Sequence, residues 1–269
     1  MDGFTQLWYN AHMKRVLAFS LIFSLIFAFS ACRADSPSDV LVDVGASPLP
    51  AASPDGADPS VSFSGKTPAA RTDSTAAAIY EGAEGLTLYG AAAYTNTGDC
   101  PITIESACFT FTAGGQTVEH SFTPPLAEYA VLMPGETSYL TAWVPQGEES
   151  PFAAGAEVFL TVSLAPRRAE AARTLLVVDH LYLADNYPNF TTLSGRITCA
   201  GVFGCEMNVV HVGFYDAEGN FLGAWYFTRN TLFEGDESKN FVVQMHELPL
   251  PALAERAETV RAIGFGFTL

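Results

Sequence analysis

The chain has 269 residues, of which 49% are apolar and 16% are charged, and its formal net charge is −16. The length allows about two ordinary domains, and the apolar content excludes a chain that is disordered throughout. The negative charge repels nucleic acid and anionic lipid headgroups. We therefore expect no nucleic-acid partner and no electrostatic attachment to a membrane.

Residues 1–31 have the pattern of an export signal. Lys14 and Arg15 are followed by the apolar run Val16–Ala31. This run is shorter than the about 20 residues that a transmembrane helix needs, whereas a positive start and an apolar middle are typical of a signal peptide. The segment of residues 1–12 is longer than such a signal usually has before its positive charges, which favours Met13 as the true start of translation.

The signal ends in Phe29-Ser30-Ala31-Cys32. This sequence resembles the lipobox of bacterial lipoproteins, although Phe29 stands where leucine is usual. The resemblance implies a diacylglycerol on Cys32, whose two acyl chains suffice for stable anchoring. We therefore expect an exported protein, lipid-anchored at the cell membrane and facing the extracytoplasmic side. An uncleaved signal anchor with an incidental cysteine is the alternative.

Residues 32–77 are expected to be the lipidated cysteine and a flexible linker. From Arg33 to Thr75 the chain is rich in Pro, Ser, Ala and Gly, and Phe63 is its one aromatic residue. Without the periodicity of a strand or a helix, the segment has no face to bury and cannot offset the entropy of its own ordering. Its expected role is to hold the folded part away from the membrane.

After residue 77 the chain becomes a series of short segments rich in Val, Phe, Tyr, Thr and Ile, separated by turn residues. A first domain is expected over residues 78–170, with strands at Gly85–Asn96, Ile102–Thr112, Thr117–Phe122, Glu136–Val144 and Ala156–Leu164. A second is expected over residues 171–269, with strands at Thr174–Leu183, Thr191–Cys199, Met207–Tyr215, Phe221–Phe227, Ser238–Met245 and Thr259–Leu269. Only Pro166–Ala172 and Pro251–Ala257 indicate a short helix or loop. Since no long helical crossover separates the strands, the sheets should be antiparallel.

The two sets of strands resemble each other. The segment Phe109–Gln116 can be aligned with Gly213–Asn220, and Leu132–Glu136 with Leu232–Asp236. The spacing between these two landmarks is similar in both halves. The sequence therefore predicts a tandem duplication.

The second copy is similar to the FxLYD family, an immunoglobulin-like β-sandwich domain of bacterial exported proteins and lipoproteins. The residues that carry the resemblance are Val210–Gly223, a strand that ends in Phe-Tyr-Asp and returns after a glycine turn, followed by Leu232–Phe241. The likeness covers Thr191–Leu269, and it covers Gly85–Leu164 in outline. It implies an all-β fold of two tandem antiparallel immunoglobulin-like sandwiches and leaves the function open.

Within this motif, apolar residues alternate before a turn. Alternation predicts that one face of the strand, formed by Val210, Val212 and Phe214, enters a core. The other face, formed by His211, Gly213 and Tyr215, should point away from that core. Asp216–Asn220 is expected to be a hairpin turn, in which Gly219 supplies a positive φ. The turn lacks the length and the terminal glutamate of a calcium loop, so no metal is expected there.

The chain has five cysteines: Cys32, Cys100, Cys108, Cys199 and Cys205. One lipid-modified cysteine and two disulfides account for all five, which fits an oxidising compartment. Cys199 and Cys205 flank a predicted turn between adjacent strands, where a disulfide fits. Cys100 and Cys108 can pair only if a bulge or loop interrupts the strand between them. A zinc site from four cysteines is the weaker alternative because neither pair has zinc-site spacing.

No catalytic motif stands out, and no cofactor is expected. The four histidines of the body (His120, His180, His211 and His246) are isolated in the sequence. Each is more readily explained as a satisfied strand or surface residue than as a ligand. The remaining candidates for binding are two aromatic runs, Trp225, Tyr226 and Phe227, and Tyr182 to Phe190. Because alternate residues of a strand face opposite ways, Trp225 and Phe227 should share one side and Tyr226 the other, with one set in the core and the other set a candidate patch for a glycan or a protein.

Three functions are compatible with this pattern. The favoured one is a non-catalytic envelope module that binds an unknown protein or polymer. The second is an exported enzyme whose site is assembled between the two domains, which predicts a histidine or carboxylate pair within hydrogen-bonding distance in a cleft. The third is a purely structural subunit of an envelope complex.

Overall fold

The computed structural model describes residues 66–82, 85–125, 130–146, 150–153, 155–170, 173–186, 190–201, 204–246 and 248–267, all within one compact unit. The expected signal segment, Cys32 and the linker up to residue 65 lie outside the described residues. Among the described residues no helix is long and apolar enough to cross a membrane. The short helix α2, Leu253–Arg256, lies in a segment expected to be helix or loop.

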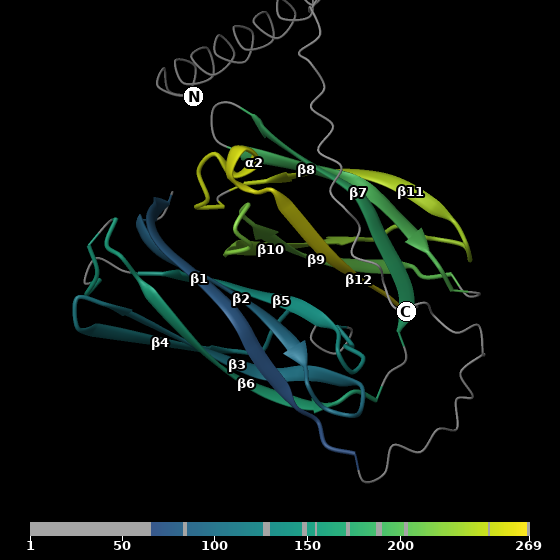
Figure 1. Ribbon diagram of the computed structural model, residues 1–269, viewed down its shortest axis with the longest axis horizontal. Coiled ribbons are helices and arrows are strands. Elements are labelled where there is room, and N and C mark those ends of the chain that lie inside the picture. Colours follow the sequence, from purple (N-terminus) through teal and green to yellow (C-terminus); the bar gives the residue numbers. More distant parts are fainter. Residues whose placement is uncertain are drawn as a thin grey trace, which may run out of the picture. The chain divides into compact units, whose positions relative to one another are not determined.

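The fold is all-β and antiparallel (Figure 1). The first half of the body contains β1 (Ala70–Gly82), β2 (Gly85–Asn96), β3 (Ile102–Ala113), β4 (Gln116–Phe122), β5 (Thr137–Pro145) and β6 (Phe159–Arg168). The second half contains β7 (Thr174–Asn186), β8 (Phe190–Cys199), β9 (Met207–Tyr215), β10 (Phe221–Arg229), β11 (Ser238–Met245) and β12 (Thr259–Phe267).

The two halves have the same strand order. In the first, the sheet β1-β2-β5 packs on the sheet β4-β3-β6. In the second, one six-stranded sheet with the order β10-β9-β12-β7-β8-β11 folds over, so that β7-β8-β11 packs on β10-β9-β12. Each strand of the first half thus has an equivalent six strands later. The order matches the A-B-E and C′-C-F strands of an immunoglobulin-like sandwich.

Strand β1 was not expected from the sequence, since it begins inside the stretch assigned to the flexible linker. Its residues are mostly small or polar, which gives no clear alternation of hydrophobicity. The strand forms because β2 pairs with it along nearly its whole length. Thr75 also donates a hydrogen bond of 3.1 Å to the carbonyl of Leu160 in β6. Tertiary pairing therefore overrides a weak local signal.

The turns before β5 and β11 show how the halves correspond. In the first turn the N–H of Gly135 donates to Asn96, and in the second the N–H of Asp236 donates to Cys199, each at 2.8 Å. Gly135 and Asp236 both have a positive φ, 84° and 62°. The equivalent of Gly135 is therefore Asp236, one position after the residue expected from the sequence alignment. The sequence comparison matched two glycines, whereas the backbone matches the positions that need a left-handed conformation.

This correspondence predicts the effect of exchanging the two turn residues. Asp236→Gly should raise the free energy of unfolding by about 0.5–1 kcal/mol, because glycine adopts a positive φ without the strain of a side chain. Gly135→Asp should lower it by a similar amount. Urea denaturation of both variants measures the pair of effects, and a loss of stability in Asp236→Gly would contradict the correspondence.

Candidate binding surface

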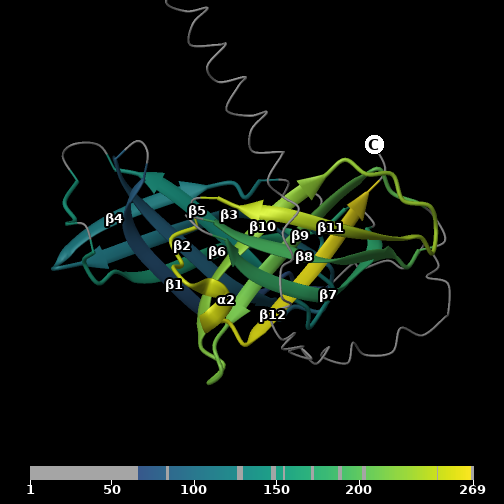
Figure 2. The same ribbon diagram turned by 90° about the horizontal axis from the view of Figure 1, so that it is seen from above.

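The two sandwiches meet in a broad contact, in which β1-β2-β5 packs on β10-β9-β12 (Figure 1). This contact determines which sheet faces are left exposed to a ligand. Strand β2 is buried on both faces. Leu88, Ala92 and Tyr94 enter the core of the first sandwich, whereas Tyr89 and Ala91 join the core cluster of the second. Seen from above, strands β9, β10 and β12 cross β1 and β2 (Figure 2). The faces of these two sheets that meet at the contact are therefore unavailable to a ligand.

Tyr89 is the main polar link across this contact. Its hydroxyl donates to the carbonyl of Ala224 at 2.6 Å and accepts from the N–H of Ala224 at 2.9 Å. Tyr89 is fully buried, and burial raises the pKa of its hydroxyl. One side chain of the first sandwich thus satisfies both backbone groups of a residue in β10, next to a bulge of that strand.

A serine and a histidine also meet across the contact. The hydroxyl of Ser138 lies 2.9 Å from Nδ1 of His211 and is also hydrogen-bonded to Tyr94. Ser138 is 0% exposed and His211 is 6% exposed. Burial lowers the pKa of His211 to about 4, and a hydrogen bond with the backbone of Tyr139 offsets this in part. The pair has the hydrogen bond that an interdomain catalytic site would need, but a substrate reaches it only if the sandwiches separate.

Arg173, immediately before β7, binds residues of both sandwiches. It donates to the carbonyl of Val131 at 2.8 Å and forms an ion pair with Glu136, both in the first sandwich. Its guanidinium lies 5.7 Å from the ring centre of Phe265 in β12. The side chain is only 9% exposed. Arg173 therefore holds residues of both sandwiches and limits their relative motion.

The three aromatic residues predicted as binding candidates do not form an exposed patch. Trp225 and Phe227 share one side of β10, with ring centres 5.9 Å apart, and pack on the core of the second sandwich. Tyr226 points the other way, toward the contact between the sandwiches, and its ring centre lies 6.0 Å from that of His211. The prediction that alternate residues face opposite sides is confirmed. Phe227 is buried and Trp225 and Tyr226 are half-buried, because the middle of β10 packs against other layers on both sides.

Among the described residues of the second sandwich, the exposed aromatic residue is Tyr182, from the other candidate run. Tyr182 is 61% exposed on the outer face of β7-β8-β11. It pairs with Ser194, which pairs in turn with Val242, and Val242 is 65% exposed. The three side chains therefore form one row across the three strands, because directly opposite residues point to the same side.

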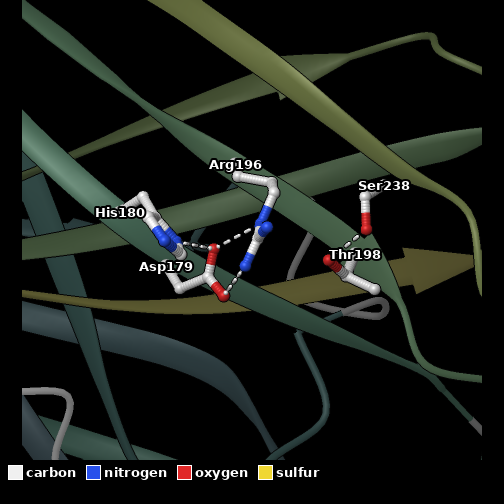
Figure 3. Close-up of polar contacts among 5 residues, drawn as sticks. All are labelled: Asp179, His180, Arg196, Thr198 and Ser238. Carbon is white, nitrogen blue, oxygen red and sulfur yellow. Dashed lines mark hydrogen bonds and ion pairs between the residues drawn. The ribbon is translucent and has the colours of Figure 1, made fainter.

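Polar groups continue this face beside the row (Figure 3). Arg196 donates two hydrogen bonds of 2.9 Å to the carboxylate of Asp179, and His180 lies 2.8 Å from the same carboxylate. The pKa of Asp179 is lowered, chiefly by the hydrogen bonds from Arg196. Thr198 and Ser238 share a hydrogen bond of 2.7 Å across β8 and β11. The face thus combines an aromatic ring, a paired charge and hydroxyl groups.

A bulge in β7 places these residues on one side. The pairing of β7 with β8 shifts between Asp179 and Tyr182, and His180 has a φ of 53°. In a regular strand Asp179 and Tyr182 would point to opposite faces. The extra residue lets both point outward, while Leu181 packs into the core. A histidine in the left-handed region is a costly feature that often marks a functional site.

The four cysteines of the body are free thiols in the structure. Cys199 and Cys205 are fully buried and their thiols contact each other. A bulge does occur between Cys100 and Cys108, at residue 105 of β3, but Cys108 still lies within the strand and pairs on both sides, with Ser121 and Ser163. Its neighbour Phe109 faces the core, so Cys108 points outward, whereas Cys100 is buried. The one bulge of β3, at residue 105, does not bring these two sulfurs together.

In the described part of the chain, no group of three or more His, Cys, Asp and Glu side chains is placed to hold a metal ion. The turn Asp216–Asn220 forms as expected, with the N–H of Asn220 donating to Asp216 at 2.7 Å and Gly219 at a φ of 82°. The carboxylate of Asp216 is thus engaged in closing the turn.

Comparisons with known proteins give no family. No protein-family model matches the chain, and no curated protein matches it. Among solved structures, red sea bream transglutaminase aligns with 74% of this chain and 32% of its own, at 9% identity and a TM-score of 0.19. The C-terminal globular domain of an oligosaccharyltransferase from Pyrococcus abyssi aligns with 70% of this chain and 42% of its own, at 10% identity and a TM-score of 0.15. At these scores neither likeness carries an argument about function.

Proposed function

We propose that this chain is an exported, lipid-anchored binding module without catalytic activity, and that it recognises a neutral polysaccharide of the cell envelope through the outer face of β7-β8-β11. The export signal and Cys32 supply the anchor, and residues 33–65 supply the tether. The observation that carries the binding proposal is the row of Tyr182, Ser194 and Val242 beside the ion pair of Asp179 and Arg196.

The chemistry of the face favours a sugar polymer. A sugar ring offers an apolar C–H face to an aromatic ring and hydroxyl groups to polar side chains, and this face provides both. The charge of Arg196 is neutralised by Asp179, so the site itself does not demand an anion. A net charge of −16 also disfavours polyanions. The contact with the first sandwich is made by the other sheet, β10-β9-β12, so the face of β7-β8-β11 is directed away from the first sandwich.

A sedimentation assay with insoluble neutral wall polysaccharide tests the binding. Tyr182→Ala should weaken binding about tenfold, which corresponds to the loss of ~1–1.5 kcal/mol of ring contact. The matched control is Phe159→Ala, because Phe159 is similarly exposed (63%) on the outer face of the first sandwich. Equal losses in both variants, or no binding by the unaltered chain, would contradict the proposal.

A separate experiment tests the anchor. Cells that produce the full chain should incorporate labelled fatty acid into it, and Cys32→Ser should abolish the label and release the protein from the membrane fraction. Label that persists in Cys32→Ser would show that Cys32 is not the attachment site.

A further inference from the structure

The loops that precede β3 and β9 are equivalent in the two sandwiches. In the first, the N–H of Asn96 donates to Glu136 at 3.0 Å; in the second, the N–H of Cys199 donates to Glu237 at 2.9 Å. The far ends of the loops also correspond, because Ile102 forms an isolated bridge with Leu132 just as Cys205 does with Phe233. Cys199 therefore occupies the position of Asn96, and Cys205 that of Ile102.

In the first sandwich the side chain of Asn96 holds this loop closed. Its Nδ2 donates to the carbonyls of Cys100 and Leu132, each at 2.9 Å, and its Oδ1 accepts from the N–H of Gly98 at 2.9 Å. Asn96 is 1% exposed. One buried amide thus ties the start of the loop to its end and to the neighbouring turn.

The second sandwich has no amide at this position, because Cys199 stands there. Its thiol contacts the thiol of Cys205, and both residues are 0% exposed. The Cys205 thiol also donates to Oδ1 of Asn208 at 2.9 Å. Gly266 lies against Cys205, where an added Cβ would come within 2.8 Å of the sulfur. Two adjacent buried sulfur atoms thus stand where the first sandwich has an amide, and oxidation would remove the hydrogen bond to Asn208.

We propose that Cys199 and Cys205 form a disulfide bond that does for the second sandwich what the amide of Asn96 does for the first. The inference rests on the proposed export, which places the chain where a disulfide-bearing oxidant is available. In the exchange, the two thiols lose two electrons and two protons, an S–S bond joins them, and the disulfide of the oxidant is reduced to two thiols. Cys100 and Cys108 remain thiols, because Cys100 is buried whereas Cys108 points outward from β3.

Thiol alkylation followed by peptide mapping tests the bond on the full chain, purified in detergent and incubated with oxidised glutathione. After unfolding, iodoacetamide should label Cys100 and Cys108 but neither Cys199 nor Cys205, and reduction should make all four reactive. The linked peptide should join Cys199 to Cys205. Labelling of all four after oxidation, or a bond that includes Cys100 or Cys108, would overturn the proposal.

Two further measurements separate the bond from other effects. Reduction should lower the Tm of the unaltered chain by roughly 5–10 °C, as expected for a short closed loop in a body of this size. It should leave the Tm of the double variant Cys199→Ala, Cys205→Ala unchanged, whereas Cys100→Ala, Cys108→Ala should respond like the unaltered chain. A bond that forms in glutathione but is absent from protein taken directly from cells would refute the export and leave the structural inference standing.

Discussion

Gly213→Ala is expected to lower the free energy of unfolding by about 3 kcal/mol, since it forces an atom into the contact between the sandwiches. A Cβ on Gly213 would lie 2.2 Å from the ring of Tyr139. That ring cannot move easily, because it is stacked on Phe221 and its hydroxyl is hydrogen-bonded to Tyr215 at 3.3 Å. Tyr139 is 4% exposed, so no open space is available for it.

A double-mutant cycle measures this effect cleanly. In a Tyr139→Leu background the added methyl group has room, so Gly213→Ala should cost less than half as much as in the unaltered chain. Chemical denaturation of the four proteins gives the coupling free energy. If Gly213→Ala costs the same in both backgrounds, Gly213 and Tyr139 do not meet as described.

Acidification is expected to weaken the same contact through His211. Burial lowers the pKa of His211 to about 4 in the folded chain, whereas an unfolded histidine titrates near 6.5. As the pH falls below about 6.5, the unfolded state binds the proton first, so the free energy of unfolding drops until the folded state is protonated too. The contribution of His211 is thus fully present above about pH 7, and about 3 kcal/mol of it is lost by pH 4.

The comparison with His211→Gln isolates this contribution from that of the many carboxylates. Glutamine can keep a hydrogen bond to Ser138 but does not titrate. Urea denaturation between pH 7 and pH 4 should show a smaller loss of stability in the variant than in the unaltered chain. Parallel pH profiles would mean that His211 is not held neutral by burial.

The sequence predicted the local features whose cause is local. The alternation of Val210, Val212 and Phe214 and the turn at Asp216–Asn220 depend only on residues within a few positions of each other. The common architecture of the two halves was also visible as a repeat. Turn residues and hydrophobic periodicity were enough to recognise antiparallel sandwiches without long helical connections.

The remaining features depend on partners far away in the chain. His211, Gly213 and Tyr215 were expected to point away from the core, and they do, but the sequence did not show that they meet the first sandwich. The small residues of β2 indicate that another sheet can approach closely, but they do not predict which sheet it is. For the same reason the sequence left open which side of the run Trp225 to Phe227 enters the core, and the packing of Trp225 became visible only in the structure.

The binding face illustrates a second limit. Tyr182 joins Asp179 and Arg196 only because a bulge at His180 turns the strand, and nothing in the sequence fixes the position of a bulge within a run of strand-forming residues. The expected pair of Cys100 and Cys108 is not joined in the structure, where Cys100 is buried and Cys108 points outward from β3. The bulge that does occur in β3 is a single residue and leaves the strand continuous.

The central claim is that the contact couples the two sandwiches into one cooperative unit, because both the interface variants and the orientation of the binding face depend on it. Scanning calorimetry of residues 66–269 tests it most directly. We predict a single transition with equal calorimetric and van't Hoff enthalpies, which Gly213→Ala either shifts as a whole or splits in two. Two separate transitions in the unaltered protein, with only one of them sensitive to pH between 7 and 4, would contradict the claim.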